Sequence, residues 1–349
     1  MQKRGEPVYN IGVFGAGSWG TAIAILLAQK GFGVRLWART SSAAAHMQEV
    51  RENVKYLPGV SFPQSLVVTS DLDIATRELA VAVIVTPSHG VRGLIKNLLP
   101  YISKDTYLVS AAKGLEVDSL LRMSQVIASE LPFADDRLAV LSGPNHAEEV
   151  SRGIPTTTVV AARRRETAEF LQDIFMAPIF RVYTNPDVVG VEIGGALKNI
   201  IALGAGISDG LNFGDNSKAA LMTRGLAEIT RLGVAMGARP QTFAGLSGLG
   251  DLVVTCTSMH SRNRRAGIAI GQGKTREEVV LNTGMVVEGI RTTKAAYYLA
   301  RTYGVNMPIA EQMYKILYEG KSPREAVTDL MLRGKTHESE EVVNNDLTW

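Results

Sequence analysis

The residues of this chain that could do chemistry fall into two groups, and the first is a glycine-rich turn. The turn consists of Gly15, Ala16, Gly17, Ser18, Trp19 and Gly20. It follows an apolar run, residues 8–14, and precedes residues 21–28, which have helix composition. Glycines at this G-x-G-x-x-G spacing let backbone N–H groups approach a pyrophosphate at the start of a helix. The pattern therefore predicts a dinucleotide-binding turn rather than a turn of purely structural use.

The type of dinucleotide is indicated by the residues that follow the second expected strand, 34–37. An NAD site commonly has an Asp or Glu there, which binds the ribose hydroxyls. This chain instead has Arg39, followed by the hydroxyl residues Thr40, Ser41 and Ser42. A guanidinium among hydroxyls suits a 2′-phosphate. We therefore expect NADP(H) as the preferred cofactor and NAD(H) as the alternative; a merely solvated Arg39 is the competing interpretation.

The second group centres on Lys198, in a helical stretch of small and apolar residues, 192–204. Small residues permit close packing, so we expect Lys198 to be buried with a pKa lowered toward neutrality, as suits a general acid or base. The alternative is a lysine whose ammonium extends to water. Asp251 follows a glycine-rich turn and is flanked by apolar residues, so it needs a partner such as a lysine. The simpler interpretation of Asp251 is a turn or N-cap acid.

Two further sets of polar residues complete the candidate site. Ser261, Arg262 and Asn263 form a group of donors at the start of an expected helix, suited to a phosphate or a carboxylate. Lys113 follows the expected strand 107–110, at the strand end where open α/β sheets bind ligands. The simpler interpretations are a surface arginine and a surface lysine.

Two kinds of element must position these residues. From residue 8 to about 185, apolar runs alternate with helical stretches, which predicts a Rossmann-type, doubly wound parallel sheet covered by helices. The expected strands are 8–14, 34–37, 66–69, 81–85, 107–110, 138–141, 156–161 and 180–183. The later pattern is helix-periodic, and helices are expected at 188–207, 217–236, 240–244, 262–271, 289–303, 308–318 and 323–332.

The change of pattern predicts an α/β domain followed by an all-α domain. We expect a dinucleotide-binding domain over 1–187, a helical substrate domain over 188–332 and a polar, frayed tail over 333–349. The substrate should lie in the cleft between the domains, where the nicotinamide end of the cofactor would arrive.

Composition excludes several classes of protein. With 46% hydrophobic and 20% charged residues among 349, the chain is typical of soluble globular proteins. Its formal net charge of +3, from dispersed residues, argues against nucleic-acid binding. The single cysteine, Cys256, excludes a disulfide framework, and five scattered histidines predict no metal site. The first residues lack a secretory signal and no stretch approaches a membrane span, so we expect a cytoplasmic protein.

Taken together, the motifs resemble those of bacterial NAD(P)-dependent glycerol-3-phosphate dehydrogenases. They occur in the same order, as Gly15-Ala16-Gly17-Ser18-Trp19-Gly20-Thr21-Ala22, Ala112-Lys113-Gly114, Ser142-Gly143-Pro144, Leu197-Lys198-Asn199, Gly248-Leu249-Gly250-Asp251 and Ser261-Arg262-Asn263. The resemblance extends from residue 8 to about 332. It implies reduction of dihydroxyacetone phosphate to sn-glycerol 3-phosphate with NADPH or NADH, feeding glycerophospholipid synthesis.

The resemblance also implies roles for individual residues. Lys198 would donate or accept the proton, and Lys113 would help to bind both cofactor and substrate. The implied substrate positions are Lys113, Gly143, Asn145, Asp251, Ser261, Arg262 and Asn263. With the glycine turn and Thr40 included, the cofactor positions are Gly15, Gly17, Ser18, Trp19, Gly20, Arg39, Thr40, Tyr56, Lys113, Ala147, Arg262, Val286 and Glu288. Two departures occur: Asn145 replaces a frequent small hydroxyl residue, and Thr40 replaces a frequent second basic residue.

Two alternatives stay open at this point. A related two-domain hydroxyacid or ketopantoate-type reductase would use Arg262 to hold a carboxylate instead of a phosphate. A non-catalytic regulator that senses NADP(H) is the alternative of another class, but it would not need Lys198 and Asp251. The apolar faces of the helical domain lead us to expect a homodimer.

Overall fold

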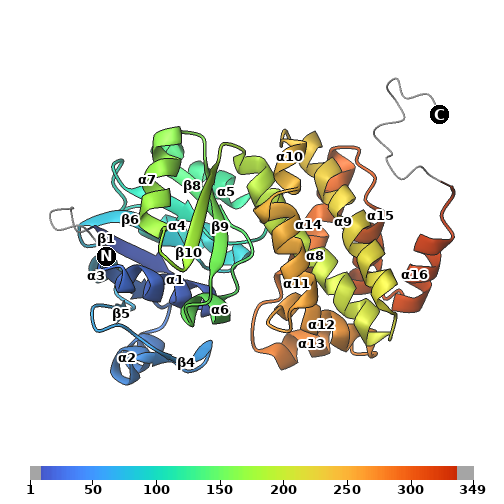
Figure 1. The fold of residues 1–349 in the computed structure, drawn as a ribbon, viewed down its shortest axis with the longest axis horizontal. Coiled ribbons are helices and arrows are strands. Elements are labelled where there is room, and N and C mark those ends of the chain that lie inside the picture. The colour runs from blue at the N-terminus through green and yellow to red at the C-terminus, as the bar shows by residue number, and fades with distance from the viewer. Residues whose placement is uncertain (1–8, 336–349) are drawn as a thin grey trace.

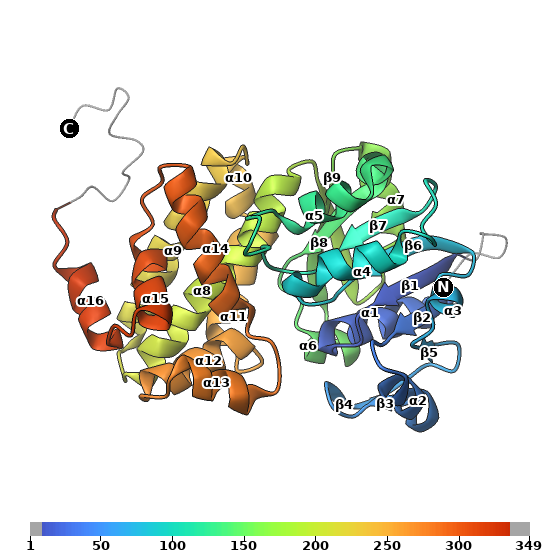
Figure 2. The same ribbon diagram turned by 180° about the vertical axis from the view of Figure 1, so that it is seen from behind.

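A computed structural model describes residues 9–335, which form a sheet-containing half and a helical half (Figures 1 and 2). The predicted fold class, a doubly wound sheet followed by helices, is confirmed. Most of the tail expected at 333–349 lies outside the described residues.

Every strand expected from the sequence occurs in one sheet, with slightly different bounds. The strands are β1 (Asn10–Phe14), β2 (Gly33–Trp37), β5 (Val67–Thr69), β6 (Leu79–Ile84), β7 (Tyr107–Ser110), β8 (Leu138–Ser142), β9 (Thr156–Ala162) and β10 (Phe180–Asn185). Their order is β10-β9-β8-β7-β6-β1-β2-β5. The strand order reverses between β1 and β6, and open α/β sheets bind ligands at such a point.

The expectation of a wholly parallel sheet is wrong at one pair of strands. The six strands from β5 to β8 pair in parallel, whereas β9 pairs with β8 in antiparallel register, Ser142 opposite Val159. β9 is almost entirely buried, and only Thr157 is partly exposed. A continuous apolar run predicts a buried strand but carries no information on its direction.

Helices cover both faces of the sheet. On one face, α1 (Ser18–Gln29), α2 (Ser41–Val50) and α7 (Arg165–Phe175) contribute to a core that contains Ile11 and Val83. On the other face, α4 (Val91–Leu98) and α5 (Met123–Glu130) pack over Phe14 and Ile84. The short helices α3 (Leu72–Ala75) and α6 (Ala147–Ser151) complete this half. Both faces of the sheet are therefore buried, as in other sheets made mainly of parallel strands.

The sequence analysis missed a small hairpin, β3 (Glu52–Asn53) with β4 (Leu57–Ser61). Its strands are short, and Pro58 and Gly59 interrupt any apolar alternation. The Asn53 amide donates to the backbone oxygen of Ala16 and, at 2.8 Å, to Thr21 Oγ1. These bonds tie the hairpin to the glycine turn, which places Tyr56 beside the candidate cofactor site.

The helical half contains all the helices expected from the sequence and two segments that were not expected. The expected ones are α8 (Val188–Gly210), α9 (Asp215–Ala235), α10 (Pro240–Phe243), α12 (Arg262–Gly271), α14 (Glu288–Thr302), α15 (Pro308–Tyr318) and α16 (Pro323–Met331). A helix α13 (Arg276–Thr283) was missed. The glycine-rich stretch before Asp251 was expected as a turn, but Leu246–Gly250 is a π-helical turn that continues into α11 (Asp251–Thr257).

Gly248 in this segment serves close packing rather than chain reversal. A Cβ atom on Gly248 would lie 2.1 Å from the backbone oxygen of Phe243. Glycine content alone therefore misled the sequence analysis, because it does not distinguish a loop from a helix that another backbone approaches closely.

Helix α8 is the central element of the helical half and contacts α9, α11, α12 and α14 (Figure 1). Contrary to the sequence analysis, it is long and apolar enough to cross a membrane, with 23 residues. Most of its apolar length is buried inside the protein, which is typical of a core helix.

Glycines allow α8 and α12 to approach closely. A Cβ on Gly206 would lie 2.0 Å from the Arg264 backbone oxygen, and a Cβ on Gly267 would lie 2.0 Å from that of Leu203. Backbone atoms cannot move aside as side-chain ends can, so neither position has room for a methyl group. This contact fixes the direction in which α12 presents Arg262 and Asn263.

We expect Gly267→Ala to destabilise the protein by about 1–3 kcal/mol, because the added methyl group overpacks the helix contact. Thermal unfolding followed by circular dichroism should show a melting temperature lower by several degrees. Gly93→Ala in α4 is the control, since a Cβ there meets no atom within 4 Å. Equal melting temperatures for the two variants would contradict this account of the α8–α12 contact.

Candidate active site

A cleft of about 1220 Å³ lies between the two halves and collects residues from both. Most of the site residues predicted from sequence line it, namely Gly15, Gly17, Ser18, Trp19, Gly20, Arg39, Thr40, Tyr56, Lys113, Asn145, Ala147, Lys198, Ser261, Arg262, Asn263, Val286 and Glu288. Gly143 and Asp251 are not among the lining residues, but both accept hydrogen bonds from Lys113. Residues that are up to 273 positions apart, from Gly15 to Glu288, thus share one cleft.

The glycine turn has the geometry of a phosphate cradle. Gly15 has φ +129°, a conformation that side chains disfavour. A Cβ on Gly20 would lie 1.9 Å from the Gly15 backbone oxygen, so this glycine lets the turn close. A Cβ on Gly17 would meet nothing within 4 Å, which leaves this backbone open to the cleft. Helix α1 begins at Ser18 and directs its N-terminus to the same place.

Polar atoms around the turn fit a bound dinucleotide. Trp19 Nε1 and Thr86 Oγ1 are buried, and neither has a hydrogen-bond partner within residues 9–335. Buried donors and hydroxyls rarely stay unpaired in native proteins, so these atoms are suited to a ligand. Arg39 and Thr40 are exposed at the end of β2, at the rim of the cleft.

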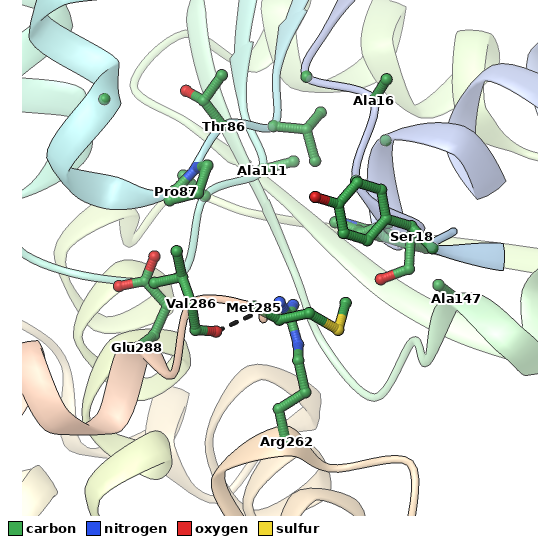
Figure 3. Close-up of a pocket in the computed structure, with 18 of the residues that line it drawn as sticks. Ala16, Ser18, Thr86, Pro87, Ala111, Ala147, Arg262, Met285, Val286 and Glu288 are labelled. Atoms are coloured by element: carbon green, nitrogen blue, oxygen red, sulfur yellow. Dashed lines mark hydrogen bonds between the residues drawn. The ribbon is translucent and has the colours of Figure 1, made fainter. Parts of the chain in front are cut away.

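Residues from the helical half face this turn across the cleft. Figure 3 shows Arg262, Met285, Val286 and Glu288 opposite Ser18, Thr86, Pro87 and Ala147. The Glu288 carboxylate accepts two hydrogen bonds from Ser88, 2.9 Å from the backbone nitrogen and 2.8 Å from the hydroxyl. Glu288 therefore connects α14 to the sheet half beside the expected cofactor site.

The centre of the site is a buried carboxylate between two lysines. Asp251, which is 1% exposed, forms an ion pair with Lys198 through Oδ1 and with Lys113 through Oδ2, the latter at 2.9 Å. Lys198 is 5% exposed, which confirms the predicted burial. The sequence analysis anticipated one lysine partner for Asp251, and the structure supplies two, one from each half.

The two lysines differ in how many N–H donors remain available. Lys113 Nζ donates to the Gly143 backbone oxygen and to Asn145 Oδ1, each at 2.8 Å, as well as to Asp251. An ammonium has three donors, so all those of Lys113 are used. Lys198 donates to Asp251 and, at 2.7 Å, to Thr255 Oγ1, and has no third partner among the described residues. Only Lys198 therefore retains an N–H for a molecule in the cleft.

Burial and charge set the protonation of this cluster. Burial lowers the pKa of Lys198 to about 8; the charge of Asp251 opposes this shift and that of Lys113 adds to it. Burial alone would raise the pKa of Asp251, but the positive charges of Lys113 and Lys198 outweigh it and the pKa is lowered. Asp251 thus stays ionised, while Lys198 can change its protonation state near neutral pH.

Ser261, Arg262 and Asn263 lie at the start of α12, as their spacing suggested. Ser261 caps the helix by accepting from the Arg264 backbone nitrogen at 3.2 Å. Arg262 donates to the Val286 backbone oxygen at 3.3 Å (Figure 3), and burial lowers its pKa without neutralising a guanidinium. Arg262 is therefore a half-buried cation that lines the cleft.

Most hydrogen-bonding groups of the Asn263 side chain are paired within the protein. Its Oδ1 accepts from the Gly289 backbone nitrogen and its Nδ2 donates to Asn199 Oδ1, each at 2.8 Å. Asn199 in turn donates to the Lys113 backbone oxygen at 3.2 Å. This chain of amides joins α14, α12 and α8 to the loop after β7, so Asn263 has one N–H left for a ligand.

Several residues of the cleft were not predicted from the sequence. Among those that line it are His89, His146, Thr255 and His260. Only Thr255 had a signal available, because it lies four residues after Asp251 and would share its face of a helix. The histidines stand singly in the sequence, and no local pattern distinguishes them from surface histidines.

Neither a metal site nor a reactive thiol accompanies this cleft in the described part of the chain. Residues 9–335 contain no cluster of three or more His, Cys, Asp or Glu side chains that could hold a metal ion. Cys256 is buried, and burial raises the pKa of its thiol to about 12. A neutral thiol is a poor nucleophile, so Lys198 is the reactive group that the cluster offers.

Known proteins match both halves of the chain. The family model of the NAD-dependent glycerol-3-phosphate dehydrogenase N-terminus matches residues 10–168, and that of the C-terminus matches residues 187–328. Glycerol-3-phosphate dehydrogenase [NAD(P)+] of Pelotomaculum thermopropionicum is 60% identical over 333 residues, covering 95% of each chain. That of Moorella thermoacetica is 58% identical over 331 residues, covering 95% of this chain and 98% of the relative.

A solved structure of a relative has the same fold. The crystal structure of glycerol-3-phosphate dehydrogenase from Coxiella burnetii superposes with a TM-score of 0.90 at 39% identity, covering 93% of this chain and 99% of the other. The family models, the relatives and this structure each span both halves of the cleft. The chain therefore belongs to the family of NAD-dependent glycerol-3-phosphate dehydrogenases.

Proposed function

We propose that the protein catalyses the reversible reduction of dihydroxyacetone phosphate to sn-glycerol 3-phosphate with NAD(P)H. The observation that carries the proposal is the third N–H of Lys198, which has no partner among the described residues. A carbonyl oxygen in the cleft could accept a hydrogen bond from it. Family membership supports this function over a ketopantoate-type reductase. The buried Lys198–Asp251 pair supports an enzyme over a sensor, because binding alone requires no proton donor.

A dinucleotide held by the glycine turn would supply the hydride for C2 in reduction and would accept it in oxidation. In reduction, the Lys198 ammonium donates a hydrogen bond to the C2 oxygen and then transfers its proton as negative charge develops there. In oxidation, neutral Lys198 takes the proton of the hydroxyl. Asp251 and Thr255 hold Lys198 in place, and Lys113 fixes Asp251 from the opposite half.

Arg262 is the proposed holder of the substrate phosphate, assisted by Ser261 and the free N–H of Asn263. Its half-buried guanidinium lines the same cleft as Lys198. Phosphate binding at a distance from C2 supplies energy that holds the carbonyl group in position for reaction. Asn145 supports the site indirectly: it accepts a hydrogen bond from Lys113 and donates one to the Thr158 hydroxyl at 3.0 Å.

The cofactor is NAD(P), and we propose that NADP(H) is preferred. The glycine turn, the open backbone at Gly17 and the unpaired atoms of Trp19 and Thr86 suit the dinucleotide itself. Arg39 supports the preference, because an exposed guanidinium at the rim of the cleft is placed to pair with a 2′-phosphate. Thr40 adds a hydroxyl at the same place.

Two expectations from sequence concern the protein as a whole and stay predictions. The first is a homodimer, which is supported by exposed apolar side chains in the helical half, such as Leu281, Met331 and Leu332. The second is a cytoplasmic location, where the product would be available for glycerophospholipid synthesis.

Lys198→Met should lower kcat at least about 100-fold, because the variant keeps the bulk of the side chain but has no proton to give. The dissociation constant for NADPH, measured by fluorescence titration, should change little. Lys104→Met serves as the control, since Lys104 is an exposed lysine away from the cleft. A kcat within threefold of the unchanged enzyme's would remove Lys198 from the proposed role.

The pKa of about 8 for Lys198 predicts opposite pH dependences for the two directions. Reduction requires the ammonium, so its kcat should fall as the pH rises through about 8, whereas oxidation requires the amine and should become faster. Asp251→Asn should move both transitions to lower pH, because the carboxylate raises the pKa of Lys198. Profiles recorded at saturating cofactor test this, and profiles without a transition between about pH 7 and about pH 9 would contradict it.

Arg39→Gln should raise KM for NADPH about tenfold or more and leave KM for NADH nearly unchanged, because only NADPH carries the 2′-phosphate. Arg181→Gln, on the strand at the opposite edge of the sheet, is the control and should change neither constant. If Arg39→Gln raised KM equally for NADPH and NADH, Arg39 would not be the source of the preference for NADPH.

A further inference from the structure

His146 has a buried nitrogen that the protein does not satisfy. The residue lies between the turn that ends β8 and the start of α6, and it lines the same cleft as Lys198 and Asn199. Its Nε2 is buried, and no group within residues 9–335 forms a hydrogen bond with it. Although His146 precedes α6, its side chain does not cap that helix. Buried polar side-chain atoms are nearly always paired, so this nitrogen is suited to a ligand in the cleft.

The surroundings favour the uncharged form of His146. Burial lowers the pKa of its imidazole, and the nearby ammonium groups of Lys198 and Lys113 lower it further. Asp251 and Glu148 act in the opposite direction without reversing the shift, and the ring of His260 lies 6.0 Å away between centroids. A neutral imidazole has one donor and one acceptor nitrogen, so it suits an uncharged polar group better than an anion.

The neighbouring residues already account for the other polar groups of the substrate. Lys198 has the free N–H for the C2 oxygen, and Arg262 has the charge for the phosphate. Dihydroxyacetone phosphate has one polar group more, the primary hydroxyl on C1. A hydroxyl can donate or accept a hydrogen bond, so it can pair with Nε2 in either tautomer of the imidazole.

We propose that Nε2 of His146 binds the free C1 hydroxyl of dihydroxyacetone phosphate and thereby makes His146 a specificity-determining residue. The proposal rests on the proposed function, since it concerns the same substrate. A site that pairs a buried polar group with a substrate hydroxyl discriminates against an analogue that lacks the hydroxyl, because the protein atom is then left unpaired. His146 would thus select the hydroxymethyl ketone over the methyl ketone.

The test compares two substrates in three enzymes. kcat/KM is measured for dihydroxyacetone phosphate and for hydroxyacetone phosphate, which has a methyl group in place of the C1 hydroxymethyl, with the unchanged enzyme, His146→Phe and His146→Gln. His146→Phe should lose about tenfold in kcat/KM on dihydroxyacetone phosphate and less than about twofold on the analogue. His146→Gln should recover part of the loss, because its amide can still bond to a hydroxyl.

Each other outcome has a definite meaning. An equal loss on both substrates would overturn the proposal, since it would indicate contact with the phosphate or a change of structure, and melting temperatures of the variants would identify the latter. No loss on either substrate would also overturn it. If turnover of the analogue is too slow to follow, its inhibition constant against dihydroxyacetone phosphate replaces kcat/KM in the comparison. Failure of the unchanged enzyme to reduce dihydroxyacetone phosphate would instead refute the proposed function.

Discussion

The buried charge of Asp251 is the constraint on which the rest of the structure depends. A carboxylate that is almost fully removed from water costs several kcal/mol unless cations compensate it. Lys198 reaches it from α8, in the same half, and Lys113 reaches it from the loop after β7, in the other half. The ion pairs therefore bring the cofactor-binding sheet and the helical half to a common point, where the chemistry is proposed to occur.

In this arrangement the two lysines, Lys113 and Lys198, have different roles. Lys113 has no donor left, so its position is fixed, whereas Lys198 has one donor left and a pKa of about 8. Other hydrogen bonds between the two halves help to hold the lysine–aspartate cluster in position. Glu192 of α8 accepts from Arg122 and from Ser124, and Glu288 of α14 accepts from Ser88. Such satisfied buried networks hold reactive groups in one geometry before a ligand arrives.

Much of the fold was predictable because its signals are local. Each strand of the large sheet stands out as an apolar run, and α8, α12 and α14 follow helical periodicity. The failures share a physical cause. The direction of β9, the hairpin at Glu52–Ser61 and the helical path of residues 246–257 depend on which distant backbone each segment packs against. Gly248, for example, indicates a loop in the sequence but serves a contact with Phe243 in the fold.

The sequence by itself determined the class of fold, the glycine turn and a set of residues most of which line the cleft, since residue types at fixed spacing carry these signals. Only the tertiary structure decided that Lys113 shares Asp251 with Lys198, that Asn263 is largely occupied by Asn199 and Gly289, and that His146 presents an unpaired nitrogen. The reason is physical. Burial and the number of free donors are properties of a packed environment, and residues more than 50 positions apart create it, as Lys198 and Asp251 do with a separation of 53.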